Sequence, residues 1–228
     1  MVLRVNKPNL ALSLAYSCLG QRCLNGDVEA VKFLYSNAWQ ESPPHIKTIT
    51  HLQNCLTGAE IENDAAGVYS NEFLYYWGMV NIGELSRLIA KDLGTAEICF
   101  NKIKSAVPKA EARLAYINLL VSDEPNKSDS NVNRLDTLRQ WAGRQDYFSS
   151  IALSKIIYYQ FLLENQPDST EQPIRAMQLL ELPRSMGHPV AVKFFDEIVM
   201  HMDTQGVCDT RDIHSIAARA KSSILYDY

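Results

Sequence analysis

The stretch GDVEAVKFL, residues 26–34, decides the fold, because a close copy of it, GHPVAVKFF, lies at residues 187–195. Both segments begin with a glycine, and the same four residues, Ala-Val-Lys-Phe, follow that glycine at the same distance. Similarity within one chain over such a separation is typical of repeat proteins, in which one supersecondary unit recurs along the sequence. The sequence therefore predicts a repeat array.

Three weaker copies lie between these two segments. FLYYWGMV begins at Phe73, ARLAYINLL at Ala112 and ALSKIIYYQFL at Ala152. From Phe73 onward the starting points are 39, 40 and 39 residues apart, and the last step ends at Ala191. The first step, from Ala30 to Phe73, is 43 residues, which a longer loop explains. A period near 40 residues is typical of HEAT, Sel1-like, extended tetratricopeptide and β-propeller repeats.

The pattern inside each unit favours helices. Apolar residues recur at i, i+3, i+4 and i+7, as in the stripe formed by Ala96, Cys99, Phe100 and Ile103. Strict alternation bounded by hairpin turns, which a propeller of strands requires, is missing. We therefore expect an all-α protein, an α/α superhelical solenoid of about five helix-pair repeats with an extra N-terminal helix.

Helical periodicity and turn chemistry together predict eleven helices. The N-terminal helix spans residues 9–23, and the five pairs are 27–40 with 44–56, 70–88 with 91–104, 109–121 with 131–142, 147–164 with 173–185, and 188–202 with 209–225. Pro43 and Pro44 suit a first helical turn, and Ser70 and Asp209 are expected N-caps. Residues 122–131 and 165–172, rich in polar residues, are expected loops. Because the period continues across every loop, we expect a single domain over residues 1–228.

Composition and charge exclude several classes of protein. The 228 residues include 26 acidic and 22 basic side chains, so the excess of lysine and arginine that binds nucleic acid is absent. No window approaches the roughly 20 apolar residues of a membrane span, and the N-terminus lacks the apolar region of a signal peptide. Five cysteines in irregular spacing indicate reduced thiols. We expect a cytoplasmic protein, or a periplasmic or secreted one if an export signal has been removed.

Motifs for catalysis, cofactors and metals are missing. The sequence has no phosphate-binding loop, no GxGxxG, no CxxC, no HExxH and no GxSxG. His188, His201 and Cys208 could converge, but we interpret the histidines as ordinary surface or core residues. We interpret the carboxylates of residues 60–64 as part of a solvated loop. The sequence thus predicts no enzyme, no cofactor and no metal site.

One segment carries a family resemblance. Residues 77–116, WGMVNIGELSRLIAKDLGTAEICFNKIKSAVPKAEARLAY, resemble a Sel1-like repeat, a relative of the tetratricopeptide repeat. Trp77-Gly78 is similar to the Leu-Gly late in that family's first helix, and Lys91-Asp92 to the pair that opens its second. The matches to its packing positions are Ala96, Phe100 and Ile103. The resemblance implies an adaptor or assembly factor, often of bacterial envelope, secretion or virulence systems.

Stacked helix pairs form a concave inner surface that suits a peptide or a partner protein. We take Trp77 and Tyr116 as the buried position of the first helix in their repeats. The residues two places before and two places after this position in each repeat then lie on other faces of the helix. They include tyrosine, lysine and small polar residues, a mixture typical of interfaces. The partner-binding residues predicted in this way are Lys32, Tyr75, Met79, Asn118, Tyr158, Lys193 and Glu197. We expect a protein or peptide partner; a ligand- or peptide-sensing regulator and a hydrolase on a helical scaffold are the alternatives.

Overall fold

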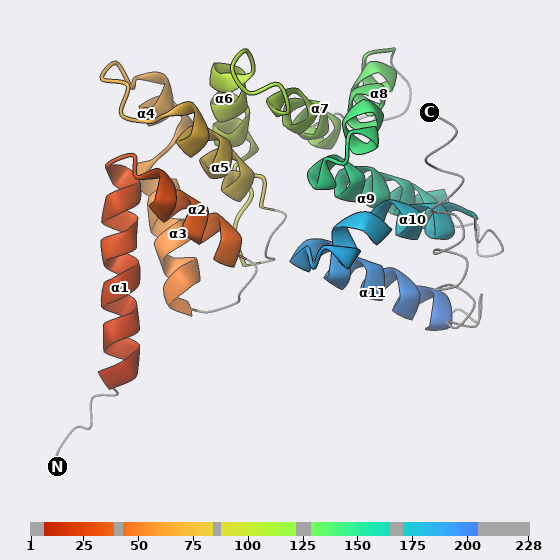
Figure 1. The fold of residues 1–228 in the computed structure, drawn as a ribbon, viewed down its shortest axis with the longest axis horizontal. Helices are drawn as coiled ribbons and strands as arrows, with labels where there is room; N and C mark the ends of the chain where they lie inside the picture. Colours follow the sequence, from red (N-terminus) through yellow and green to blue (C-terminus); the bar gives the residue numbers. More distant parts are fainter. Residues whose placement is uncertain (1–6, 39–42, 84–87, 122–128, 165–170, 205–228) are drawn as a thin grey trace. The chain divides into compact units, whose positions relative to one another are not determined.

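The computed structural model describes residues 7–38, 43–83, 88–121, 129–164 and 171–204. Within those ranges the chain is helical, with turns and no strand, which confirms the all-α prediction (Figure 1). The helices are α1 (Lys7–Leu24), α2 (Val28–Asn37), α3 (Pro43–Cys55), α4 (Gly58–Glu62), α5 (Asn71–Asn81), α6 (Leu93–Ile103), α7 (Ala110–Val121), α8 (Asp129–Gly143), α9 (Tyr147–Glu164), α10 (Glu171–Ser185) and α11 (Pro189–Thr204).

Ten of the eleven expected helices lie wholly or mainly within the described residues, and a helix is present at each of these ten places. The expected helix at residues 209–225, with its cap Asp209, lies outside them. The interpretation of residues 60–64 as a loop is wrong in part, because Thr57 accepts a hydrogen bond from the Glu60 N–H and starts the short helix α4. The helix expected to reach residue 88 ends at Asn81, since Gly83 adopts a left-handed conformation with φ 70°.

Two loop boundaries also differ from expectation. Residues 129–131 belong to α8 and residues 171–172 to α10, although both stretches were expected to be loops. The remaining parts of the two loops, residues 122–128 and 165–170, lie outside the described residues. Serine, aspartate and asparagine favour both loops and the first turn of a helix, so composition alone misplaces such a boundary.

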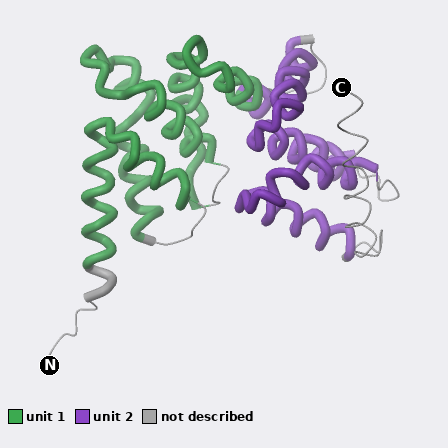
Figure 2. The backbone as a smooth tube through the Cα atoms, in the orientation of Figure 1, with its two compact units in different colours: residues 1–117 green, residues 118–228 purple. Residues whose placement is uncertain are grey.

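The chain divides into two compact units, residues 1–117 and 118–228 (Figure 2). In the first unit α5 packs against α6 and α2, α1 packs against α3, and α4 packs against α6. In the second unit α9 packs against α8 and α10, and α10 packs against α11. The expected pairs α5–α6 and α9–α10 are therefore present, whereas α2 and α3 each make their main contacts with other helices. A single continuous solenoid stays a prediction.

One turn recurs before α2, α9 and α11. Ahead of α2 the Asp27 N–H donates to the Arg22 carbonyl at 3.0 Å and the Gly26 N–H donates to the Cys23 carbonyl at 2.9 Å, the Schellman pattern that ends a helix. The same pair of bonds precedes α9 and α11, from Asp146 to Trp141, Gln145 to Ala142, His188 to Pro183 and Gly187 to Arg184. The left-handed position of each turn is filled by Gly26, Gln145 and Gly187. The two Ala-Val-Lys-Phe segments therefore follow equivalent turns.

The two Ala-Val-Lys-Phe segments are nevertheless buried differently. In α2 the Val31 side chain is buried and Phe33 is 48% exposed. In α11 the order is reversed: Val192 is 37% exposed, and Phe194 is buried with its ring centroid 5.7 Å from that of Tyr158. The same four residues thus place their aromatic ring on the surface in the first unit and in the core in the second, because the neighbouring helices cover different faces.

The core of the first unit is built around Trp77. Its indole N–H donates to the Leu56 carbonyl at 3.1 Å, and its side chain is fully buried. One turn later the Asn81 amide donates to the Trp77 carbonyl and accepts a bond from Gln53 of α3 at 3.1 Å. Gly78 lies directly against the buried Phe100 ring of α6. Hydrogen bonds thus join α5 to the α3 segment, and close packing joins it to α6.

The second unit packs around α9. The Ser154 hydroxyl, which is fully buried, donates to the Ala176 carbonyl at 2.7 Å and so holds α9 and α10 close together. The apolar side chains that share this core come from three helices, namely Ile151, Tyr158, Phe161, Ala176, Met177, Leu180, Ala191, Phe194, Phe195, Ile198 and Met202. Each of these helices hides one stripe, which is how a helical unit acquires a common core.

The contact between Gly78 and Phe100 predicts a packing effect. A Cβ at Gly78 would lie 2.7 Å from Phe100 Cζ, and the Phe100 ring is fully buried. We expect Gly78→Ala to lower the free energy of unfolding by about 1–3 kcal/mol despite the better helix propensity of alanine. Gly143→Ala is the control, because nothing lies within 4 Å of its Cβ. Urea denaturation that ranks the two variants equally would contradict the packing.

Buried His45 predicts a pH dependence. Its ring packs edge-on against Tyr16, its Nε2 has no hydrogen-bond partner, and burial lowers its pKa below the usual value. As the pH falls through about 6.5, His45 binds a proton more readily in the unfolded chain than in the folded chain. The stability is therefore present above that pH and is lost below it. We expect thermal stability to fall between pH 7.5 and 5.5.

The His45→Leu variant separates this effect from others. His188 of the second unit also has a lowered pKa, caused by burial and by the Lys155 cation, so some pH dependence remains. The carboxyl groups of Asp27 and Asp64 have lowered pKa values, so their protonation affects stability only at more acidic pH. The melting temperature of His45→Leu should vary less between pH 7.5 and 5.5 than that of the unmodified chain, and an equal variation would contradict the role of His45.

Candidate partner-binding surface

An exposed surface on α2 and α5 combines aromatic and charged side chains. We call it the α2–α5 face, and it consists of Glu29, Lys32, Phe33, Tyr35, Glu72 and Tyr76. Phe33 and the two glutamates are exposed, whereas Lys32 and the two tyrosines are half-buried. Both helices belong to the first unit and pack against each other, so their mutual placement is defined.

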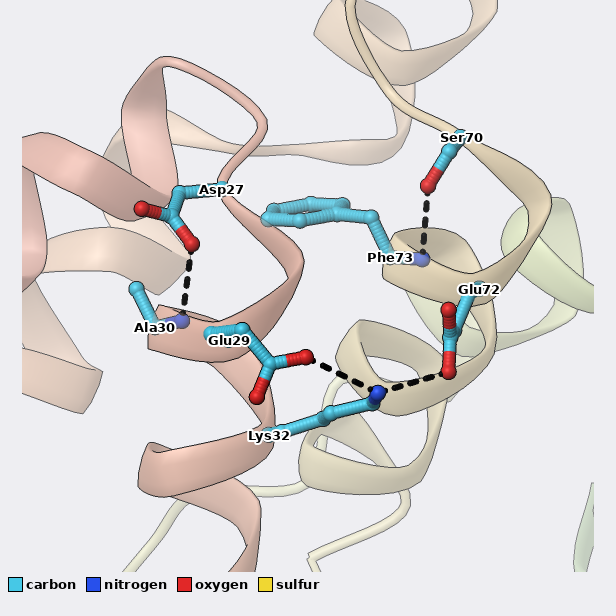
Figure 3. Close-up of polar contacts among 7 residues, drawn as sticks. All are labelled: Asp27, Glu29, Ala30, Lys32, Ser70, Glu72 and Phe73. Atoms are coloured by element: carbon cyan, nitrogen blue, oxygen red, sulfur yellow. Dashed lines mark hydrogen bonds and ion pairs between the residues drawn. The ribbon is translucent and has the colours of Figure 1, made fainter.

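Capping residues fix where both helices begin (Figure 3). Asp27 accepts a hydrogen bond from the Ala30 N–H at 3.1 Å, and Ser70 accepts one from the Phe73 N–H at 3.2 Å. Each bond satisfies a backbone donor that the first helical turn leaves without a partner. The predicted cap Ser70 is therefore confirmed. Since each helix starts at a fixed residue, the side chains one turn later project at fixed angles.

Lys32 connects the two helices. Its Nζ lies 3.0 Å from Glu29 Oε1 on the same helix and 2.8 Å from Glu72 Oε1 on α5 (Figure 3). The hydrogen bonds that Lys32 donates to Glu72 and, less strongly, to Glu29 raise the pKa of Lys32 above its usual value. The Nζ also lies 5.7 Å from the centre of the Tyr76 ring, within the range of a cation–π contact. The cation is thus held in one place rather than left to move on its flexible stem.

Aromatic rings line the same face. The rings of Tyr35 and Tyr76 are 5.4 Å apart between centroids, and Phe33 lies 6.5 Å from the Tyr16 ring of α1. Isolated apolar side chains are common on protein surfaces, but here two rings form a pair between helices, and the Lys32 cation lies beside Tyr76. Exposed aromatic groups with a charged border are typical of protein-binding surfaces.

The structure corrects the expected exposure of two residues in the first unit. Tyr75 and Met79 were predicted on a partner-facing surface, but both are buried. The Tyr75 hydroxyl accepts a hydrogen bond from Arg113 at 2.7 Å, and Lys109 Nζ lies 4.2 Å from its ring centre. Residues of α6 and α7 therefore cover this side of α5, and the ring also packs against Phe100.

Of the four predicted partner-binding residues in the second unit, one is buried and three are not. Tyr158 is buried, with its hydroxyl 2.5 Å from His201 Nδ1, and burial is the main cause that raises its pKa to about 12. Its expected exposure is therefore wrong. Lys193 is exposed, whereas Asn118 and Glu197 are half-buried. The Asn118 carbonyl accepts a bond from Arg134 at 3.4 Å. Partner binding by any of the seven predicted residues stays a prediction.

Sequence reasoning found Lys32 but missed the residues around it. A Glu–Lys pair at i and i+3, as in Glu29 and Lys32, is a visible signal of a surface ion pair on a helix. No such signal marks Glu72, because its partner lies on another helix. The repeat pattern gave no sign that Phe33 is exposed, because the equivalent residue of the other segment, Phe194, is buried.

The described residues contain little that suggests chemistry. No group of three or more histidine, cysteine or acidic side chains in the described ranges could hold a metal ion. Burial raises the pKa of the Cys23 thiol to about 12 and raises that of Cys99 as well, so both stay protonated. His201 is engaged with Tyr158, and Cys208 lies outside the described residues.

The described helices were also compared with the requirements of a membrane span. None of them combines the length and the apolar character needed to cross a bilayer.

Comparisons with known proteins find no counterpart. No protein-family model, no curated protein and no solved structure matches the chain. The similarity to Sel1-like repeats therefore rests on the residues quoted from the sequence, above all Trp77-Gly78 and the Asp92 cap of α6.

Burial of Tyr158 predicts how its variants behave. Tyr158→Ala should lower the free energy of unfolding by about 3–5 kcal/mol, as expected for a large buried ring. Tyr158→Phe, which loses only the hydrogen bond to His201, should cost about 1 kcal/mol. Tyr159→Ala is the control, because the adjacent Tyr159 ring is exposed. If urea denaturation shows equal losses for the two alanine variants, the burial of Tyr158 is wrong.

Proposed function

We propose that the chain is a non-enzymatic adaptor of the Sel1-like kind and that the α2–α5 face binds a protein or peptide partner. The observation that carries the proposal is the exposed Phe33 ring of α2, the helix whose Tyr35 ring pairs with Tyr76 of α5. A partner that covered Phe33 would remove its apolar area from water, a gain of about 25 cal/mol for each Å². Large aromatic side chains are frequent among the few residues that dominate binding energies.

The ions on the α2–α5 face give the proposed site its selectivity. Lys32 already has two carboxylate partners, so an acidic partner would have to compete with Glu29 and Glu72. A partner with a basic or neutral polar group would instead meet the exposed glutamate oxygens without breaking the pairs. The proposed partner segment therefore presents an apolar side chain to Phe33 and donors, not acids, to its border.

The helical scaffold supports the same function. Neighbouring helices held by caps and by close packing present their exposed side chains with little conformational freedom left to lose. Binding to such a surface avoids much of the entropic cost of ordering side chains at an interface. Equivalent Schellman turns at three junctions support the repeat character on which the resemblance to adaptors depends.

Affinity capture tests the proposal. The tagged chain and its variants would be used to recover partners from cells of the source organism after cross-linking, with quantification by mass spectrometry. We expect Phe33→Ala and Lys32→Glu each to reduce recovery of a specific partner at least about tenfold, which corresponds to roughly 1.4 kcal/mol. Phe33→Ala removes the ring, and Lys32→Glu places three carboxylates together.

Val132→Ala is the matched control, because Val132 of α8 is 50% exposed and Phe33 is 48% exposed. Circular dichroism must show that all three variants are folded. Equal recovery of every partner by Phe33→Ala, Lys32→Glu and the unmodified chain would show that the α2–α5 face is not the binding surface.

A further inference from the structure

His51 and Cys55 form a pair of metal-binding side chains on the surface of α3. They are four residues apart, which places them on one face of the helix, and Cys55 Sγ lies 3.8 Å from His51 Nε2. His51 is exposed and Cys55 is half-buried. Nothing in the proposed adaptor function requires this pair.

The separation of the two atoms fits a tetrahedral zinc ion. Zinc lies about 2.3 Å from a thiolate sulfur and about 2.0 Å from an imidazole nitrogen, so two such ligands at a tetrahedral angle are roughly 3.5 Å apart. The observed 3.8 Å therefore requires only a small side-chain rotation. Histidine and cysteine are also the ligands that zinc prefers among protein side chains.

The position of the pair on the helix favours a cation. Cys55 is the last residue of α3, where the backbone carbonyls give the helix end a partial negative charge. Lys47, one turn before His51, is the nearby cation on this helix and is exposed to solvent. The Cys55 thiol would lose its proton to solvent on binding, and the resulting thiolate would balance one of the two charges of Zn²⁺.

One chain supplies only half of a zinc site. No third histidine, cysteine or carboxylate joins the pair within the described residues, whereas structural zinc sites have four protein ligands. We propose that two copies of the chain share one Zn²⁺ ion, with His51 and Cys55 of each copy forming a Cys2His2 site. Two identical half-sites related by a twofold axis would complete the tetrahedron and link the copies.

Metal titration with a mass measurement tests the proposal. The full chain, kept reduced with a phosphine, would be titrated with Co²⁺, whose visible absorption reports tetrahedral thiolate ligation, and with Zn²⁺ in competition. Light scattering after size exclusion would give the mass with and without Zn²⁺. We expect one metal ion for each two chains, a doubling of the mass with zinc, and reversal of both effects by a chelator.

Variants assign the ligands. Cys55→Ser and His51→Ala should each weaken metal binding at least about tenfold and leave the mass that of one chain. Cys18→Ser is the control, because Cys18 is the exposed cysteine of α1 and should have no effect. Both ligand variants alter surface positions, and circular dichroism would confirm their fold.

Four results would overturn the proposal. The first is an absence of cobalt absorption in the unmodified chain, and the second is metal binding that persists in both ligand variants. The third is binding of one ion to one chain without a change of mass, which would show that no second copy takes part. A dimer that forms without zinc and disappears with the reductant would be a disulfide dimer and would equally overturn it.

Discussion

The hydrogen bond from the Trp77 indole to the Leu56 carbonyl is the constraint on which the first unit depends. Leu56 follows the last residue of α3, so the bond ties the middle of α5 to the end of another helix. Loss of this bond would be costly, because both residues are buried and the two polar groups would be left without partners. With α5 held there, Gly78 can meet the Phe100 ring of α6, and the opposite side of α5 is left to α2.

Much of the fold could be predicted because its determinants are local. Apolar periodicity marks the long helices, and prolines and capping side chains such as Ser70 mark where they begin. The end of α5 at Asn81 was missed because apolar periodicity does not reveal the left-handed backbone conformation of Gly83. The short helix α4 was missed because five residues carry too little pattern, although Thr57 is an ordinary cap.

The binding surface was harder to predict because exposure depends on neighbouring helices. Spacing along one helix shows which residues share a face, but it does not show what covers that face. Tyr75 and Tyr158 were both expected on the surface, but both are covered, the first by cations and the second by His201 and aromatic rings. Phe33 and Phe194 share a sequence context, yet only Phe33 is exposed.

A physical account of the α2–α5 face follows from these constraints. The Lys32 pair with Glu72 is exposed and contributes little to stability by itself. Its consequence is geometric, because it links side chains of two helices that the core already holds together. The Tyr76 ring beneath the ammonium group and the Tyr35 ring beside it gain a fixed border on one edge. An exposed ring such as Phe33 can then act as the anchor of a surface whose shape is set before a partner arrives.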